Sequence, residues 1–573
     1  MRNTRKQAII KGLIVFLFFI GLVLYYKPSE PYATGDGIEY VLTTEAWYNH
    51  GSPEIRYSDF CTFKADFLQH QTWQSNYKKV AFDAVGAFLK ENASPRKEYG
   101  GFYRNSRGNV YGYHFVFYSL VNVPSRALMA MWHIHPIKGF LFTNLFFCAL
   151  LLAVILFSSK SLPWENLLFF VAVFFSGFFY YQTWTHPEAI TVVLVALGMV
   201  FLHEKRFHAA LCCVALAALQ NQPLLFLLIW LFGYVGYAYK FKFKSILPFI
   251  LYALMFLIPS LYFYMLFGTT SLIKDAGYLS FSNCTLNRIV GFFFDFNQGM
   301  VLSLGNWLLF YGVLLIFRVF VMLKNKDWGA WDLIPFVVVA MSVLVSTMSN
   351  WNHGMAIINR YAVWIQIPIL FHATLLIKPL RIIPKVTLIV AGLSSQILLL
   401  VIHLPLNQFD WSNLQHMPLG KWMLDHYPKL YNPDPQIFIA RTNQVFDFSK
   451  QSSPVCYFNE KNELTKIAVH KDNVDTLASW GYPLEAIEEQ PTARSGKEEW
   501  IYINDFTSKS TKSSKNILAL IQQSEIGRII SEMKKNPQWM EELNKKANEN
   551  HHSLDQQIEL DARFIFNERH NLP

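Results

Sequence analysis

Long apolar stretches separated by short basic segments are the main pattern along the chain. Seven of them are clear, and each approaches the roughly 20 residues that an α-helix needs to cross the hydrocarbon core of a bilayer. They lie at about 8–26, 140–158, 246–267, 300–323, 332–348, 360–377 and 386–404. The pattern predicts an all-α polytopic membrane protein.

The apolar region 165–239 needs to be divided. We expect spans at 165–182 and 187–202, followed by a hairpin over 209–239 that is broken at Gln220-Asn221-Gln222-Pro223. As one helix, 209–239 would extend about 46 Å at 1.5 Å per residue, well beyond a core of about 30 Å. With this division the chain has eleven predicted spans.

Basic residues give the predicted orientation, because loops on the cytoplasmic side are enriched in Lys and Arg. The basic residues within 2–6 precede the first span and place the N-terminus in the cytoplasm. That span lacks a small-residue cleavage site, so we interpret it as an uncleaved anchor. With eleven spans every inner loop carries Lys or Arg, and the C-terminus lies outside.

Three long segments are then predicted outside: 27–139, 268–299 and 405–573. Residues 77–91 show apolar positions at helical spacing and predict a helix on the membrane surface. Residues 111–132 are apolar but contain Pro124 and Arg126. We expect an interfacial or re-entrant helix there, because one more span would invert every later loop.

The polar segment 405–573 predicts a small extracytoplasmic α+β domain that follows a membrane domain over 1–404. Short strands are predicted at 436–447, 455–458, 464–469 and 499–503, with a hairpin turn at 459–463. Helices are predicted at 515–535 and 554–568. Ser553 and Gln556 form a capping box for the last helix.

Composition supports the membrane interpretation. Of the 573 residues, 53% are hydrophobic and only 16% are charged, whereas soluble domains carry about 25% charged residues. These values exclude disordered, collagen-like and disulfide-scaffold classes. The net charge of +10 does not indicate nucleic acid, because the basic residues lie in short clusters between apolar stretches.

The six cysteines show no metal-ligand spacing. Cys61, Cys284 and Cys456 are predicted outside, so one disulfide among them is left open.

Ionisable residues at the outer ends of spans are the candidates for chemistry, because they are costly near lipid unless they serve a function. Asp36 and Glu39 are three residues apart and share one face of a starting helix. The pair could deprotonate an acceptor hydroxyl or hold a divalent cation. The alternative is a helix cap followed by a first-turn acid.

Three further groups lie at a similar predicted depth on the same side: His186 with Glu188, Asp295 with Gln298, and His353 with Arg360 and Tyr361. Helix starts, capping and snorkelling to lipid headgroups are their alternative explanations. Arg360 is also suited to a bidentate grip on phosphate. Together the groups predict a site for a lipid-linked phosphate substrate.

The order and predicted sidedness of these motifs resemble the GT-C superfamily of integral-membrane glycosyltransferases, which includes protein O-mannosyltransferases and the aminoarabinose transferase of lipid A. The resemblance covers about 1–440. Its motifs are GDGIEY (35–40), YGYH (111–114), FDFNQGM (294–300), WNHGMAIINRY (351–361) and LGKWMLDHYPKLYNPDPQIF (419–438).

The resemblance implies transfer of a sugar from a polyprenyl-phosphate donor to a hydroxyl of an envelope lipid, glycan or protein at the outer face. It implies Asp36 as the base, with Glu39 supporting it or helping to bind a cation. Arg360 would bind the donor phosphate, with Lys274 and Arg288 as alternatives. The remaining candidates, including Tyr113 and His114, would bind substrate. The chain departs from the family's commoner Asp-Glu doublet, because Gly37 follows Asp36.

We therefore predict a multi-pass glycosyltransferase of a bacterial cytoplasmic membrane, with membrane lipid but no nucleic acid among its partners. The alternatives are a transporter or flippase for a lipid-linked saccharide, and a non-catalytic subunit of an envelope polysaccharide assembly system. Transporters tend to place charged residues at the bilayer midplane in paired repeats. Here the candidates lie at one surface and no repeat is evident, which favours the enzyme.

Overall fold

The computed structural model describes residues 2–29, 31, 35–69, 79–91, 98–158, 164–349, 351–352, 358–403, 414–443, 454–461, 463–479, 491–495, 498–504 and 514–569. The chain forms two compact units. The first contains Met1–Cys284, Phe292–Phe294 and Gln298–Asp410; the second contains Thr285–Gly291, Asp295–Asn297 and Trp411–Pro573. We refer to the second as the tail unit.

Within the described residues, five helices are long and apolar enough to cross a membrane by length and composition. They are α1 (Arg2–Tyr26), α6 (Lys138–Ser158), α17 (Asn306–Asn325), α19 (Arg360–Ile377) and α20 (Ile382–His403). Helices α12 (Phe243–Met255) and α13 (Ile258–Phe267) make a sixth if this pair, bent by 41°, is one span. The chain is therefore compatible with a helical membrane protein.

The other predicted spans contain shorter apolar helices. These are α7 (Trp164–Phe174), α9 (Glu188–His203), α10 (Phe207–Gln220), η1 (Gln222–Leu224) with α11 (Leu225–Ala238), and η3 (Ala330–Leu333) with α18 (Ile334–Ser346). The predicted break after Gln220 is confirmed. Each of these helices is shorter than the roughly 20 residues typical of a membrane span, so eleven crossings stay a prediction.

Two predicted spans are interrupted. The span 165–182 divides into α7 and α8 (Phe178–Tyr181), and the span 300–323 divides into α16 (Val301–Leu304) and α17. Gly305 joins the last two with a φ of 54°, a conformation that glycine adopts without steric cost.

The segment between α13 and α16 contains α14 (Leu272–Asp275), η2 (Phe281–Asn283) and α15 (Leu286–Phe294).

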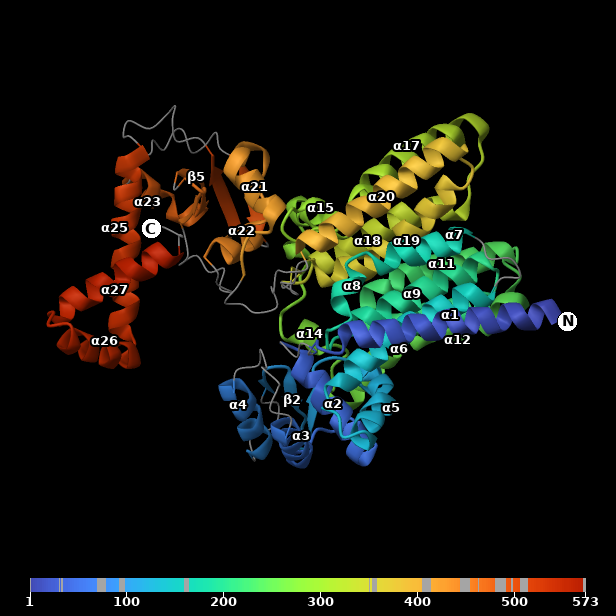
Figure 1. Ribbon diagram of the computed structural model, residues 1–573, viewed down its shortest axis with the longest axis horizontal. Coiled ribbons are helices and arrows are strands. Elements are labelled where there is room, and N and C mark those ends of the chain that lie inside the picture. The colour runs from blue at the N-terminus through green and yellow to red at the C-terminus, as the bar shows by residue number, and fades with distance from the viewer. Residues whose placement is uncertain are drawn as a thin grey trace. The chain divides into compact units, whose positions relative to one another are not determined.

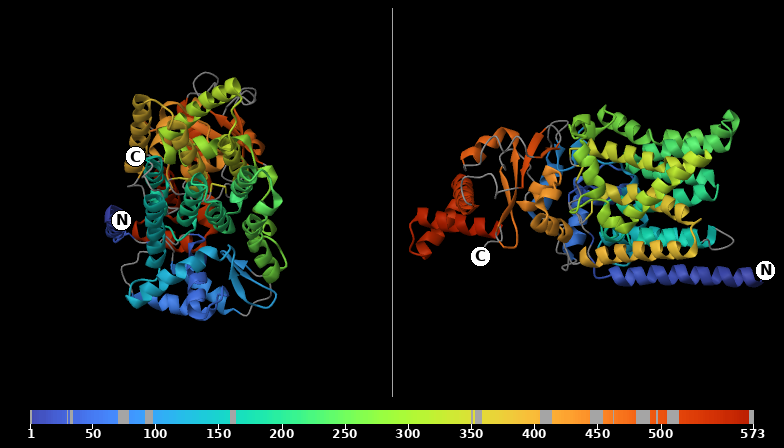
Figure 2. Two further views of the ribbon diagram at one scale, coloured as in Figure 1. Left: turned by 90° about the vertical axis from the view of Figure 1, so that its right-hand side faces the viewer. Right: turned by 90° about the horizontal axis from the view of Figure 1, so that it is seen from above.

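Helices α9 and α19 form the centre of the helical bundle (Figure 1). They pack on each other, and α9 also packs on α6 and α10. Of the apolar window in α19, 89% is buried, against 6% for α1. Helix α1 runs along the outside of the bundle (Figure 2), where its main partner is α6. The apolar surface of α1 is thus available to lipid.

The segment between α1 and α6 folds on the bundle as helices and one small sheet. Its helices are α2 (Gly37–His50), α3 (Tyr57–Gln69), α4 (Lys79–Lys90) and α5 (Phe117–Met131). The antiparallel strands are β1 (Glu98–Tyr99), β2 (Phe102–Arg104) and β3 (Val110–Gly112). Helices α4 and α5 lie within the ranges predicted to be helical, whereas the sheet was not predicted.

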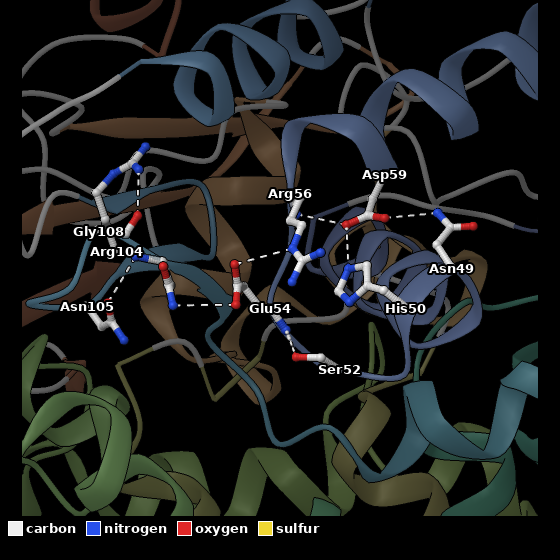
Figure 3. A network of polar contacts seen from close by, with 10 residues as sticks. Asn49, His50, Ser52, Glu54, Arg56, Asp59, Arg104, Asn105 and Gly108 are labelled. Carbon is white, nitrogen blue, oxygen red and sulfur yellow. Dashed lines mark hydrogen bonds and ion pairs between the residues drawn. The ribbon is translucent and has the colours of Figure 1, made fainter.

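A network of polar contacts joins α2, α3 and the β2–β3 hairpin (Figure 3). The buried Asp59 carboxylate accepts a hydrogen bond from Asn49 Nδ2 at 2.9 Å and lies 3.1 Å from His50 Nε2. Asn109 Nδ2 donates to Glu54 Oε2 at 3.4 Å. The end of α2 is therefore tied to the hairpin that leads into Tyr113.

The charge that interrupts the apolar segment 111–132 is paired inside the protein. Arg126 of α5 forms two hydrogen bonds with Glu45 of α2, at 2.5 Å from Nε and 3.0 Å from Nη2. Both side chains are buried. Because the pair satisfies both charges, α5 packs against α2 and α6 without leaving a charge unpaired.

The tail unit is an α+β fold, as predicted. Strands β4 (Val455–Phe458), β5 (Leu464–His470), β6 (Thr492–Ser495) and β7 (Glu498–Ile503) form an antiparallel sheet in the order β4-β5-β7-β6. The helices are α21 (Pro418–His426), α22 (Pro435–Thr442), α23 (Val474–Ser479), α25 (Ser514–Lys535), α26 (Pro537–Glu549) and α27 (Leu554–Arg569).

The predicted strand at 436–447 is wrong, because α22 occupies the described part of this range. Asp434 Oδ1 accepts a hydrogen bond from Gln436 N at 2.9 Å, and Pro435 fills the first helical position. Both residue types favour a helix start at these positions. The predicted capping box is confirmed: Gln556 N donates to Ser553 Oγ, and Ser553 N donates to Gln556 Oε1.

None of the six cysteines, which all lie in described segments, is part of a disulfide. The disulfide left open among Cys61, Cys284 and Cys456 is therefore not formed in this structure.

A buried lysine provides a test of the tail unit. Lys466 is 0% exposed, and its ammonium donates to Pro428 O at 2.8 Å, to Asn432 Oδ1 at 2.7 Å and to Asn504 Oδ1. We expect Lys466→Met to lower the free energy of unfolding of this unit by about 2–3 kcal/mol, because the three oxygens lose a charged donor.

The measurements are protease resistance and thermal unfolding of the full chain in detergent. In both, the cleavage or unfolding of the tail unit is followed. Lys471→Met is the matched control, because Lys471 is exposed and contributes one surface ion pair with Glu499. Equal effects of the two substitutions would contradict the prediction.

Candidate functional site

Three helix starts and one loop of the first unit bring their polar residues together. Asp36 precedes α2, Glu188 begins α9, and Arg360 begins α19. His114 follows β3. At α19 the start is fixed locally, because the Asn359 side chain accepts a hydrogen bond from the backbone N–H of Tyr361 at 2.9 Å.

Arg360 is the centre of this cluster. Its Nη1 donates to Asp36 Oδ2 at 3.2 Å, and its Nε lies 3.8 Å from Glu188 Oε1. Its Nη2 donates to the Tyr361 hydroxyl at 2.9 Å. The side chain of Arg360 is 8% exposed and that of Glu188 is 2%, whereas that of Asp36 is 26%. Asp36 is thus the carboxylate that solvent or a ligand can reach.

Glu39 is held behind Asp36 by His114. Glu39 Oε1 accepts the backbone N–H of His114 at 2.6 Å, and Oε2 lies 3.0 Å from His114 Nδ1. The other ring nitrogen, Nε2, lies 3.8 Å from Asp36 Oδ2. The imidazole therefore stands between two carboxylates, one buried and one accessible.

Glu39 and His114 shift each other's pKa. Burial raises the pKa of Glu39, and the nearby His114 opposes part of this increase. Burial lowers the pKa of His114, but the charges of Glu39 and Asp36 outweigh it, and the net pKa of His114 is raised. Both pKa shifts favour the protonated form of the group concerned.

Glycine at position 112 makes room for Glu39. A Cβ atom there would lie 2.6 Å from Glu39 Oε1. We expect Gly112→Ala to displace the Glu39 carboxylate and to reduce any activity of this site by about tenfold, since a small misplacement of supporting groups is costly. Gly312→Ala is the control, because a Cβ there meets nothing within 4 Å.

The measurement is turnover by each variant, with melting temperature in detergent recorded in parallel. Equal turnover by the two variants would show that the close fit of Gly112 against Glu39 does not affect turnover.

A cavity of about 200 Å³ adjoins the cluster. Its lining includes polar residues, among them His114, Glu188, Arg360, Tyr361, Tyr40, Tyr113, Gln220, Asn221 and Gln222. The lining also includes apolar residues, among them Phe256, Pro259, Phe263, Leu272, Ile273, Leu279, Leu344 and Met348. The cavity is therefore suited to a ligand with a polar head and an apolar tail.

No family model, curated protein or solved structure matches this chain. The assignment of a family therefore stays a prediction.

The other sequence-predicted residues of the first unit lie in different settings. His186 is buried, with its ring 5.8 Å from that of Tyr40. Tyr113 lines the cavity and stacks on Tyr103 at 5.5 Å. Gln298 is buried, and its backbone oxygen accepts from Asn359 N at 2.9 Å. His353 lies outside the described residues.

Asp295 belongs to the tail unit. Its Oδ2 accepts from the Tyr431 hydroxyl at 2.9 Å, and its Oδ1 accepts from Asn297 N at 2.7 Å. Arg288, an alternative phosphate ligand, is buried in the same unit 3.8 Å from Asp434. These contacts give both residues a structural role within the tail unit. Lys274, the other alternative, is exposed on α14.

One group of three side chains near the cavity is suited to bind a divalent cation. Asp36, Glu39 and His114 offer ligand atoms that all lie within 4.8 Å of one another. Carboxylate oxygens with one imidazole nitrogen are a common donor set for divalent metals. These three residues would hold the ion, which would supply a Lewis acid next to the cavity.

Sequence reasoning missed several residues of the cavity wall. Gln220, Asn221 and Gln222 were interpreted only as a helix break, yet all three line the cavity. Three consecutive carboxamides inside an apolar region were the available signal, because such groups are costly unless they line a polar space. Tyr40 carried no comparable signal.

Proposed function

We propose that this chain is a membrane glycosyltransferase of GT-C type that moves a sugar from a polyprenyl-phosphate donor to an acceptor hydroxyl. The observation that carries the proposal is the accessible Asp36 carboxylate 3.2 Å from the buried Arg360 guanidinium, because Arg360 also lines a cavity with polar and apolar residues. A carboxylate beside a cation that lines a cavity provides the two groups that such a transfer needs.

The cavity suits this donor class. A prenyl chain is apolar and matches the apolar lining residues of α13, α14 and α18, whereas a sugar phosphate matches the polar lining residues. Water occupies about 30 Å³ per molecule in the liquid, so 200 Å³ corresponds to a small group such as one sugar ring. Arg360 can offer two parallel N–H donors to the phosphate.

The proposed reaction uses Asp36 as the base. The acceptor hydroxyl attacks the anomeric carbon through an oxocarbenium-like transition state. As the new C–O bond forms, the hydroxyl proton passes to the Asp36 carboxylate. The C–O bond to the phosphate breaks, its electron pair stays on the phosphate oxygen, and Arg360 stabilises that charge.

The proposed setting is a bacterial cytoplasmic membrane crossed eleven times, with the N-terminus inside. The site and the tail unit are proposed to face outside. The five long apolar helices and the bent pair α12–α13 support a membrane location. The predicted charge distribution among the loops supports the orientation.

A transporter for a lipid-linked saccharide is the second candidate. Two interrupted segments, α10–η1–α11 and α12–α13, line the cavity. Broken helices at a binding site are typical of transporters. A transporter would bind the same lipid without cleaving it.

The test is incubation of the purified protein in lipid with a panel of labelled polyprenyl-phosphate sugars and with membrane extract as the acceptor source. Transfer or hydrolysis of one donor, lost in Asp36→Asn, is the expected result. Binding and translocation without cleavage would favour the transporter. If no donor is cleaved and none is bound and translocated, both the glycosyltransferase and the transporter proposals are rejected.

A further inference from the structure

Glu188 lines the cavity, and one of its carboxylate oxygens is buried without a hydrogen bond. Glu188 is 2% exposed, and its Oε1 faces Arg360 Nε at 3.8 Å. Its other oxygen, Oε2, is buried and has no hydrogen-bond partner within the described part of the chain. An unsatisfied buried acceptor of this kind costs about 1–3 kcal/mol or more. A ligand that donates a hydrogen bond would recover this free energy.

Other polar groups line the same cavity as Glu188. Asn221 Nδ2 donates to Thr191 Oγ1 at 2.7 Å, which fixes its amide. Gln222 is half-buried at the break between α10 and α11. The Tyr40 hydroxyl accepts from Gln220 Nε2 at 3.3 Å, which leaves its own hydrogen for another acceptor.

These groups are suited to a neutral ligand with several hydroxyl groups. Arg360 already balances the charge of Glu188 Oε1, so Oε2 needs a hydrogen-bond donor more than a second cation. Carboxamides can both donate and accept, and hydroxyl groups do the same. The described polar groups therefore complement the edge of a sugar ring.

We propose that the Glu188 carboxylate and the Gln222 carboxamide bind hydroxyl groups of the transferred sugar and so decide which sugar is used. This inference rests on the proposed glycosyl transfer and extends it to the recognition of the sugar. Asp36 and Arg360 act on the reacting bonds, whereas Glu188 and Gln222 act on ring positions away from them. A site that is built to bind a hydroxyl rejects an analogue without it strongly, by up to about 10⁴–10⁵-fold.

The experiment compares the active donor from the panel with its monodeoxy analogues, one for each hydroxyl of the sugar. We expect wild type to lose at least about 100-fold in kcat/KM for one analogue. In Gln222→Leu and in Glu188→Gln we expect a lower kcat/KM for the parent donor. We also expect the ratio of kcat/KM for the parent donor to kcat/KM for that analogue to fall at least tenfold. A ratio that stays at the wild-type value in both variants would overturn the inference.

Met348→Leu is the matched control, because Met348 is an apolar residue that lines the same cavity and the substitution nearly conserves volume. Its ratio is expected to equal that of wild type. Melting temperatures in detergent show whether each variant is folded. If wild type cleaves no donor at all, the proposed function itself fails. If wild type is active and the ratio is unchanged in the variants, only the inference fails.

Discussion

Asp36→Asn is expected to reduce turnover of the proposed transfer by about 10²–10⁴-fold, which corresponds to roughly 3–5 kcal/mol of barrier. The amide has nearly the shape of the carboxylate but cannot accept the acceptor's proton at neutral pH. Because Asp36 is 26% exposed and lies beside α2, the variant should insert and fold as wild type does.

The measurement is single-turnover transfer with the donor identified from the panel. Asp83→Asn is the matched control, because Asp83 is an exposed carboxylate of α4 that pairs with Lys64 at the surface, at 2.8 Å. Its turnover should equal that of wild type. Undiminished transfer by Asp36→Asn would remove Asp36 from the mechanism.

Arg360→Lys is expected to lower kcat/KM for the donor by about 10²–10³-fold. Removal of one preorganised hydrogen-bond donor at a developing charge typically has this effect. Lysine keeps the positive charge but lacks the planar fork that meets Asp36 and Tyr361 at once. Arg360→Ala would also leave Asp36 and Glu188 without their cation, and breaking a buried pair costs about 3–5 kcal/mol of stability.

The test measures transfer as a function of donor concentration, with protein stability recorded in parallel. Arg206→Lys is the control, since Arg206 is 54% exposed and lies 4.0 Å from Glu204. Donor kinetics of Arg360→Lys that match wild type would assign the phosphate to another cation.

Much of the fold follows from hydrophobic length and spacing. The start of α19 at Arg360, the break after Gln220 and the strands β4 and β5 all appear where periodicity and turn residues placed them. The strand predicted at 436–447 was wrong for a local reason. Its apolar residues suit either state, and the Asp434-Pro435 start decides for a helix.

The candidate site was only partly accessible from sequence. Position at the outer ends of spans was enough to select Asp36, Glu188 and Arg360 as neighbours. The clamp of His114 on Glu39 depends on the pairing of β2 with β3, and short strands of two or three residues leave no clear periodicity. Asp295 has the same sequence signal as Asp36, but long-range packing with Tyr431 places it in the tail unit.

Two of the helix starts at the site help to explain how several acids can stand beside one guanidinium. Asp36 occupies the N-cap position of α2, Glu39 lies in the first turn of α2, and Glu188 lies in the first turn of α9. The partial positive charge at a helix N-terminus stabilises a nearby anion by about 0.3–1 kcal/mol. Backbone dipoles thus supply compensation that a count of side-chain charges omits. A substitution that unwinds either first turn should therefore alter the local potential even if every ionisable side chain is kept.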